Sequence, residues 1–266
     1  MNREQFCSLC AWFNNYVQSF GGTDAETRRA FRLKEEHTAR VRANIVRIGR
    51  SLDLGAGDLL LAEAIALFHD VGRFRQFAVY RTFSDRRSEN HALLGLRELE
   101  RAGVLSALPE EERAVIFKAI GCHNLRDLPA NLPERHLLFA RLIRDADKLD
   151  ILGLFAGECS RRDREPDRLV VAALPDTPGY SPGLVENLLR GKTCSYADAK
   201  NFNDRKLLHL SWIYDVNFSW TLAEIVRNGY IETIIEALPA TREIQAVREH
   251  LLAYAARRQE PGAGTP

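Results

Sequence analysis

The sequence predicts an all-α fold, and three observations lead to that prediction. Apolar residues recur at steps of three and four along most of the 266-residue chain, which is the period of a helix that buries one face. Strand-like character is confined to one short fragment, RLVVAAL at residues 168–174. The sequence also lacks the alternating strand and helix patterns that indicate a parallel sheet.

Start and stop signals place the helices of the first part of the chain. The run from Thr23 to Glu26 is a capping box that begins a helix, and Pro109 followed by three glutamates begins another. Residues 71–90 hold Gly, Arg, Ser and Asp without a period, so we expect an irregular loop there. In chain order, we expect helices at about residues 6–20, 23–52, 58–70, 91–102, 109–122 and 134–152.

A second helical part is expected near the C-terminus. A charged stretch marked by proline and glycine, residues 160–180, precedes it. Ser181 and the proline after it begin one helix, and three more are expected up to about Arg258, separated near Gly229 and Pro239. The final EPGAGTP should be disordered.

Composition limits the kind of partner. The chain is 45% hydrophobic and 27% charged, as in soluble globular proteins, and its formal net charge of +1 gives no overall field for a nucleic-acid polymer or a membrane surface. We expect no signal peptide and no spanning helix. Five scattered cysteines indicate free thiols in the cytoplasm. Cys7 and Cys10 are spaced CxxC, but without a second pair they are better interpreted as packing residues than as zinc ligands.

Six polar residues stand where the apolar pattern predicts core or helix ends. Imidazole and carboxylate together suit divalent transition metals, and six ligands exceed what one tetrahedral ion needs, so the set indicates two metals that activate water. Taken singly, each histidine is more often a helix cap or a surface residue, and Asp145 and Asp150 are equal candidates to the aspartate between them. The six are His37, His69, Asp70, His91, His123 and Asp147.

The order of these residues resembles the H…HD…D signature of the HD-domain superfamily of metal-dependent phosphohydrolases. LFHDVGRF resembles the block that carries the HD pair, and RDADKLD resembles the closing aspartate block. NHALLG and AIGCHN resemble the blocks that supply two further histidines. The resemblance implies an HD-domain-like helical bundle with additional C-terminal helices, which agrees with the helical periodicity.

The resemblance also implies the ligand set. His37, His69, Asp70 and Asp147 match the four core ligands. His91 and His123 match the extra pair of the binuclear branch, which includes cyclic-nucleotide and cyclic-dinucleotide phosphodiesterases. The chain departs from the HD-GYP branch in three motifs, so a cyclic dinucleotide is not expected. We expect a single domain over residues 1–258, with a motif-bearing core at 31–155, a C-terminal helical part at 181–258 and a disordered tail at 259–266.

Phosphoester chemistry assigns further roles. Asp70, His91, His123 and Arg73 are the candidate catalytic residues, with Asp70 bridging the metals or orienting water and a histidine acting as general acid where it is not a ligand. Arg73, Arg81 and Lys148 are the candidates for binding the substrate. We expect a small phosphorylated substrate and two divalent ions chosen from Fe, Mn, Ni, Co, Zn and Mg. The sequence leaves the oligomeric state open, with a homo-oligomer as one alternative.

Two other functions share these features. Some HD-domain proteins are di-iron oxygenases with the same four histidines and two aspartates, and others are non-catalytic sensors that typically lose the ligands. His136, His209 and His250 lie outside the pattern, and we expect structural or surface roles for them. The aromatic segment 210–220 is expected to pack in the core, with a substrate lid or base-stacking surface as the alternative.

Overall fold

The computed structural model describes residues 1–21, 24–161, 167, 169 and 174–260. Within these ranges every regular element is a helix, which confirms the all-α prediction. The chain divides into two compact units, residues 1–147 and 148–266, and α7 (Glu134–Cys159) begins in the first and ends in the second. Whether the units act as one domain stays a prediction.

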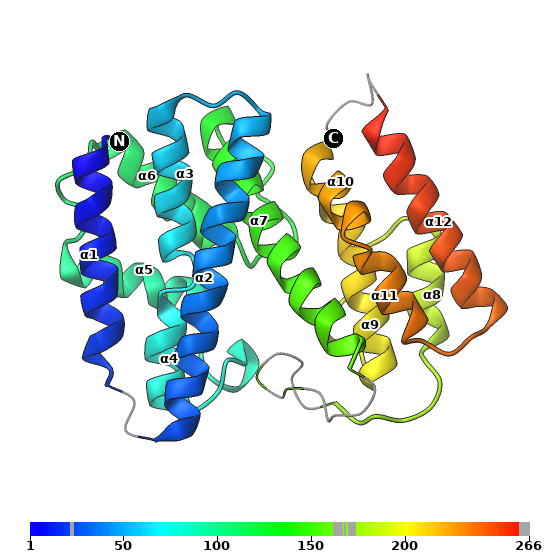
Figure 1. Ribbon diagram of the computed structural model, residues 1–266. Coiled ribbons are helices and arrows are strands. Elements are labelled where there is room, and N and C mark those ends of the chain that lie inside the picture. The colour runs from blue at the N-terminus through cyan, green and yellow to red at the C-terminus, as the bar shows by residue number, and fades with distance from the viewer. Residues whose placement is uncertain (22–23, 162–166, 168, 170–173, 261–266) are drawn as a thin grey trace. The chain divides into compact units, whose positions relative to one another are not determined.

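The first unit is built around α3 (Ala56–Phe68), against which three helices pack, while α4 (Gly72–Tyr80) packs on α5 (His91–Ala102) (Figure 1). From Leu61 to Val71 nearly every side chain of α3 and the turn after it is buried. Leucine and alanine favour the helix, and the alanines allow neighbouring helices to approach closely. The helices of this unit before α7 are α1 (Arg3–Ser19), α2 (Ala25–Ser51), α3 (Ala56–Phe68), α4 (Gly72–Tyr80), α5 (His91–Ala102) and α6 (Glu110–Cys122).

Side-chain caps fix where several of these helices begin. The Asp24 carboxylate accepts a hydrogen bond from the Thr27 backbone N–H, so Asp24 is the N-cap of α2. The capping box predicted from Thr23 falls partly outside the described residues. Asn90 accepts from the backbone N–H groups of the second and third residues of α5, which therefore begins at His91 as predicted.

The prediction of an irregular loop over residues 71–90 is wrong for its first half. Residues 72–80 form α4, and a short 3-10 turn, η1 (Asp85–Arg87), follows. The arginines in this segment obscured a helical face in which Val71, Phe74 and Phe77 recur every third residue and are buried. Helix α7 also continues past its predicted end, because Phe155 and the alanine after it extend the buried face.

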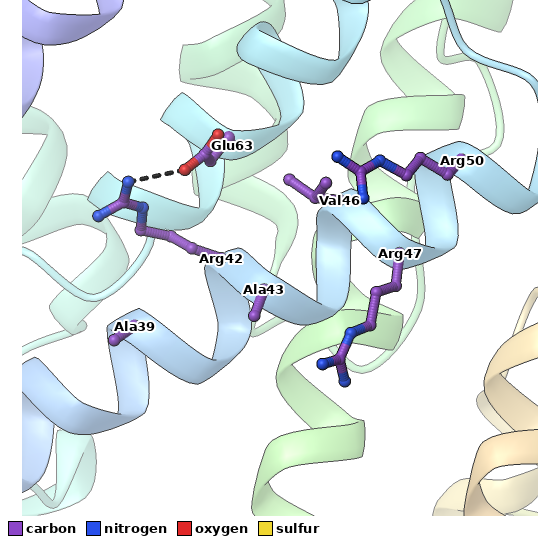
Figure 2. A pocket seen from close by; sticks show the side chains of 7 residues that line it. All are labelled: Ala39, Arg42, Ala43, Val46, Arg47, Arg50 and Glu63. Carbon is purple, nitrogen blue, oxygen red and sulfur yellow. Dashed lines mark hydrogen bonds and ion pairs between the residues drawn. The ribbon is translucent and has the colours of Figure 1, made fainter.

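A shallow cavity of about 390 Å³ lies on α2 and α3 (Figure 2). Three arginines dominate its lining, and one of them, Arg42, donates to Glu63 of α3 at 2.7 Å. Its full lining is Ala39, Arg42, Ala43, Val46, Arg47, Arg50 and Glu63. None of the six candidate metal ligands belongs to it.

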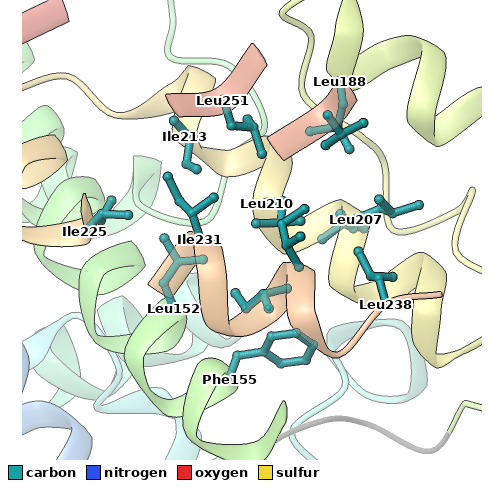
Figure 3. Close-up of a cluster of buried hydrophobic side chains, with 14 of the residues drawn as sticks. Leu152, Phe155, Leu188, Leu207, Leu210, Ile213, Ile225, Ile231, Leu238 and Leu251 are labelled. Carbon is teal, nitrogen blue, oxygen red and sulfur yellow. The ribbon is translucent and has the colours of Figure 1, made fainter. Parts of the chain in front are cut away.

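The second unit encloses its own apolar core, in which Leu152 and Phe155 of α7 meet leucines and isoleucines of the later helices (Figure 3). These helices are α8 (Pro182–Leu189), α9 (Phe202–Ser211), α10 (Ser219–Arg227), α11 (Tyr230–Glu236) and α12 (Arg242–Gln259), with a 3-10 turn η2 (Trp212–Asp215) after α9. The breaks near Gly229 and Pro239 are confirmed, and Gly229 adopts φ 67°, which glycine allows without strain.

The prediction of three helices after α8 is wrong, because the chain also breaks between Ser211 and Ser219. The aromatic segment 210–220 lies across this break, with Leu210 and Ile213 buried in the core as expected. Most of RLVVAAL and residues 261–266 of the tail fall outside the described residues. In the part of the chain that the structure describes, no helix is both long and apolar enough to cross a bilayer.

Candidate metal centre

The structure brings the six predicted ligands together inside the first unit. Five are buried, and Asp147 keeps 17% of its side chain exposed. Each occupies a defined place on a helix: His37 within α2, His69 at the C-cap of α3 with Asp70 after it, His91 at the start of α5, His123 at the C-cap of α6, and Asp147 within α7.

The metal-capable atoms form two groups that share one carboxylate. His37, His69 and Asp70 make one triad, and Asp70, His91 and His123 make the other, with the ligand atoms of each triad within 4.8 Å of one another. The Nε2 atoms of His37 and His69 are 3.3 Å apart, and those of His91 and His123 are 2.9 Å apart. Asp70 Oδ1 lies 3.3 Å from His91 Nε2, and its Oδ2 lies 3.5 Å from His37 Nε2.

Asp147 adds a second carboxylate beside the first triad. Its Oδ1 lies 3.1 Å from His37 Nε2 and 3.8 Å from His69 Nε2. The carboxylate of Asp147, the α7 aspartate chosen from the sequence motif, thus contacts two of the imidazoles.

Hydrogen bonds fix the tautomer of three of the histidines. His69 Nδ1 lies 2.7 Å from the Ala66 carbonyl oxygen, and His123 Nδ1 lies 2.7 Å from the Ile120 carbonyl oxygen. A carbonyl only accepts, so each Nδ1 carries the proton and each Nε2 presents a lone pair to the cluster. Both histidines end a helix, where the carbonyl three residues earlier is available as a partner.

His91 has a different partner. Its Nδ1 lies 2.7 Å from Asp85 Oδ2. Burial alone would raise the pKa of Asp85, but the hydrogen bond from His91 lowers that pKa below its ordinary value. The carboxylate is therefore ionised and accepts the Nδ1 proton, so the Nε2 of His91 also presents a lone pair.

The imidazoles of His91 and His123 are neutral at pH 7. Burial lowers the pKa of His91 and of His123 to about 4, with the Arg73 charge adding to the effect on His91 and His69 adding to that on His123. Burial likewise lowers the pKa of His69. Two neutral Nε2 lone pairs that face each other at 2.9 Å repel, and a cation between them would convert the repulsion into coordination. The donor set thus fits a divalent metal.

Both aspartates of the cluster carry negative charge. Burial would raise the pKa of Asp70, but the charge of Lys34, whose Nζ lies 2.7 Å from Oδ2, holds it well below the usual range, helped by His69 and Arg73. Burial would also raise the pKa of Asp147, and the hydrogen bond with His37 lowers it instead. Ionised carboxylates are the form that binds a metal.

A contact between glycines sets the spacing of α4 and α5. A Cβ atom added to Gly72 would lie 2.1 Å from the His91 carbonyl oxygen and 2.5 Å from the Gly95 nitrogen. A Cβ added to Gly95 would lie 3.1 Å from the Gly72 nitrogen. Only glycine permits this approach, which places the His69–Asp70 turn next to the start of α5.

Sequence reasoning missed several residues that support the cluster. Arg144 of α7 is buried and donates to backbone carbonyls beyond the C-terminus of α6, including those of Leu125 and, at 3.0 Å, Arg126. A cation at a helix C-terminus satisfies carbonyls without helical partners, so Arg144 fixes the turn that carries His123. Lys34 and Asp85 were missed as well. Only three-dimensional contact distinguishes these residues from surface charges.

The predicted substrate-binding residues lie in different places. Arg73 is beside the cluster, 3.4 Å from Asp70 Oδ1, and also donates to Asp85 at 2.8 Å. Arg81 forms ion pairs with Asp24 and Glu26 at the start of α2, roughly 17–20 Å along that helix from His37 at about 1.5 Å per residue. Arg81 is therefore not brought to the cluster.

Lys148 and the pair Cys7 and Cys10 are the remaining residues considered in the sequence. Lys148 follows Asp147 on α7 and lies in the second unit, where its Nζ is 2.8 Å from Asp215 Oδ2. Its role in substrate binding stays a prediction. Cys7 is exposed and Cys10 half-buried, and neither belongs to a metal-capable group among the described residues.

These features define the first unit as a helical domain with a buried His/Asp centre suited to metal. The family model described as HD domain matches residues 35–152, which contain all six candidate ligands. This segment of the chain belongs to the HD domain family, as its motifs predicted. No curated protein and no solved structure matches the chain.

Proposed function

We propose that this protein is a metal-dependent phosphohydrolase that cleaves a small phosphoester or nucleotide with activated water. The observation that carries the proposal is the pair of buried triads that share Asp70. Two divalent ions held in this way lower the pKa of water and neutralise the oxygens of a phosphoester, which is the chemistry they supply when bound. The HD domain family also implies a metal-dependent, hydrolase-like protein.

Besides the shared Asp70, each of the two metal positions has its own donors. His37, His69 and Asp147 serve one position and His91 and His123 serve the other, with Asp70 between them. A buried imidazole with a pKa of about 4 is neutral at pH 7 and has no proton on the Nε2 that faces the cluster, so His91 and His123 fit the role of ligand better than that of general acid.

Two cationic side chains flank the shared carboxylate and suit a phosphate. The Lys34 side chain is 17% exposed and that of Arg73 is 16% exposed, so both reach the edge of the buried cluster. Arg73 is held by Asp70, Asp85 and Gln76, which fixes its charge in place. Lys34 has a single flexible ammonium group that can turn from Asp70 to a phosphate oxygen.

The test is hydrolysis of bis(4-nitrophenyl) phosphate and of a panel of nucleotides, cyclic nucleotides and sugar phosphates by Mn²⁺-loaded protein without oxygen. The proposal predicts turnover that chelation abolishes and that metal restores. A fully loaded protein that hydrolyses no member of the panel contradicts it. Lys34→Ala should then raise KM for the substrate while metal content stays unchanged.

A di-iron oxygenase is the second candidate, and the same donor set favours it, because imidazole and carboxylate also suit iron. Oxygen separates the two reactions. Iron-loaded protein that consumes oxygen only with substrate, and shows a mixed-valence pair by electron paramagnetic resonance, would replace the hydrolase proposal.

A further inference from the structure

The imidazoles of the cluster differ in what supports them from behind. His69 and His123 donate their Nδ1 protons to backbone carbonyls, whereas His91 donates to the carboxylate of Asp85 at 2.7 Å. An anionic partner makes an imidazole a stronger ligand than a neutral carbonyl does. Of these three imidazoles, His91 therefore receives additional negative charge.

Asp85 is held in a fixed orientation by α4. Its Oδ1 accepts from Arg73 Nη1 at 2.8 Å and from Gln76 Nε2 at 2.9 Å, while its Oδ2 faces His91. Gln76 is fully buried and also donates to Ser88 Oγ at 2.8 Å and to the Glu89 carbonyl at 3.0 Å. The loop between α4 and α5 is thus anchored so that one carboxylate oxygen points at one imidazole.

The two triads also differ in direct negative charge. Asp147 contacts His37 and His69 and adds a full carboxylate to the first triad. In the second triad, the carboxylates that pair with His91 are the shared Asp70 and, through Nδ1, Asp85, while Asp147 acts on His123 through its charge. Asp85 is placed where it compensates for the carboxylate that the second triad lacks.

We propose that Asp85 is a positioning residue that fixes the Nδ1-protonated tautomer of His91 and supplies the charge on which the Asp70–His91–His123 metal position depends. The position made by His37, His69 and Asp147 does not depend on it. This inference rests on the proposed function only in assuming that the cluster binds two ions.

The test uses the full-length protein with Asp85→Asn. An asparagine cannot accept on both sides: its amide nitrogen faces either His91 or the pair Arg73 and Gln76, which both donate. Asp85 Oδ1 accepts from the charged Arg73 and from Gln76 at 2.8 and 2.9 Å, whereas Oδ2 accepts from His91 and, only at 3.4 Å, from Asn124. The charge-assisted side is the stronger one, so we expect the asparagine nitrogen to face His91 and the imidazole to lose its Nδ1 proton. Long-range ¹H–¹⁵N spectra of the metal-free protein should show His91 change to the Nε2-protonated tautomer.

A calorimetric Zn²⁺ titration provides the second readout. Wild-type protein should take up two ions, and Asp85→Asn should weaken one of them by about 10–100-fold and leave the other unchanged. The matched control is Asp58→Asn, because Asp58 is equally exposed at 31% and also pairs with an arginine, Arg135, away from the cluster. This control should preserve both the tautomer of His91 and the two affinities.

The proposal is overturned if Asp85→Asn keeps the wild-type tautomer, if it weakens neither ion or both ions equally, or if wild-type protein takes up fewer than two. Should the asparagine variant not fold, Asp85→Ala removes the charge without a misplaced donor, and failure of both to fold would assign Asp85 a purely structural role. None of these readouts requires turnover. A protein that binds two ions and hydrolyses nothing therefore refutes the proposed function and leaves this inference to be judged separately.

Discussion

Both units of the molecule bury histidines, but the two units surround them differently. His91 and His123 of the first unit direct Nε2 atoms at each other across 2.9 Å, next to Asp70. His209 of the second unit stacks on Phe155 with ring centroids 4.0 Å apart and donates its Nδ1 proton to the Arg205 carbonyl at 2.8 Å. No metal-capable group among the described residues includes His209.

Burial lowers the pKa of all three histidines, so a shifted pKa does not by itself identify a metal centre. The difference lies in where the second ring nitrogen points. In the first unit the Nδ1 protons are donated to fixed acceptors, and the Nε2 lone pairs point into the cluster, next to the carboxylates. In the second unit the ring serves as a flat, packed side chain.

The largest effect is expected from Asp70→Asn. Both triads share this carboxylate, and loss of its charge removes a ligand from each. Hydrolysis and metal content should fall by more than about 100-fold, because changes behind a ligand already cost about 10–100-fold. Metal analysis after desalting, together with kcat, measures this. His209→Phe should retain wild-type metal content, and equal losses in the two variants would remove the distinction between the units.

The acid stability of the second unit should depend on His209. Burial and the Arg205 charge lower the pKa of His209 to about 3, against about 6.5 in the unfolded chain. The unfolded state therefore binds the proton first as pH falls, and folding stability is lost between about pH 6.5 and pH 3. Relative to His209→Phe, wild-type protein should lose on the order of 3 kcal/mol from pH 7 to pH 4. Urea titrations of both proteins at several pH values measure the difference, which parallel curves would contradict.

Metal should stabilise the first unit. An ion that binds only the folded state at 100 times its Kd adds about 2.7 kcal/mol of stability per site. Unfolding monitored with and without Mn²⁺ should show this gain in wild-type protein and in His209→Phe. The gain should vanish in Asp70→Asn. A gain of the same size in that variant would locate the bound metal elsewhere.

The smallest effect is expected from a pair of glycines. Gly72→Ala should destabilise the first unit by about 1–3 kcal/mol, because its Cβ meets the backbone of α5. Gly121→Ala, whose Cβ would rest 3.5 Å from Leu96, should be neutral or stabilising by up to about 1 kcal/mol. Denaturant midpoints measure both changes. Equal midpoints in the two variants would show that α4 and α5 can separate without cost.

The sequence predicted those parts of the centre that depend on residue type and order. Histidines and aspartates in five separate blocks have few alternative explanations, and the structure places all six in one cluster. Helix α5 was predicted from end to end because both ends carry local signals, the Asn90 cap and Gly103 with φ 60°.

Other parts depend on contacts that no local pattern encodes. Asp85 lay in a segment expected to be irregular, and its contact with His91 depends on Gln76 of α4, which holds the same carboxylate from the other side. The face of α4 left a signal in Val71, Phe74 and Phe77, which the neighbouring charges obscured. Arg81 was selected for its charge alone, and its partners at the start of α2 could not be read from the sequence.

The central claim is that these six side chains bind two divalent ions. The most direct measurement is anomalous X-ray diffraction from crystals of the Mn²⁺-loaded protein. The account predicts two peaks, one among His37, His69 and Asp147 and one between His91 and His123, each within about 2.0–2.4 Å of its ligand atoms and both next to Asp70. A fully loaded crystal without a peak at this cluster would contradict it.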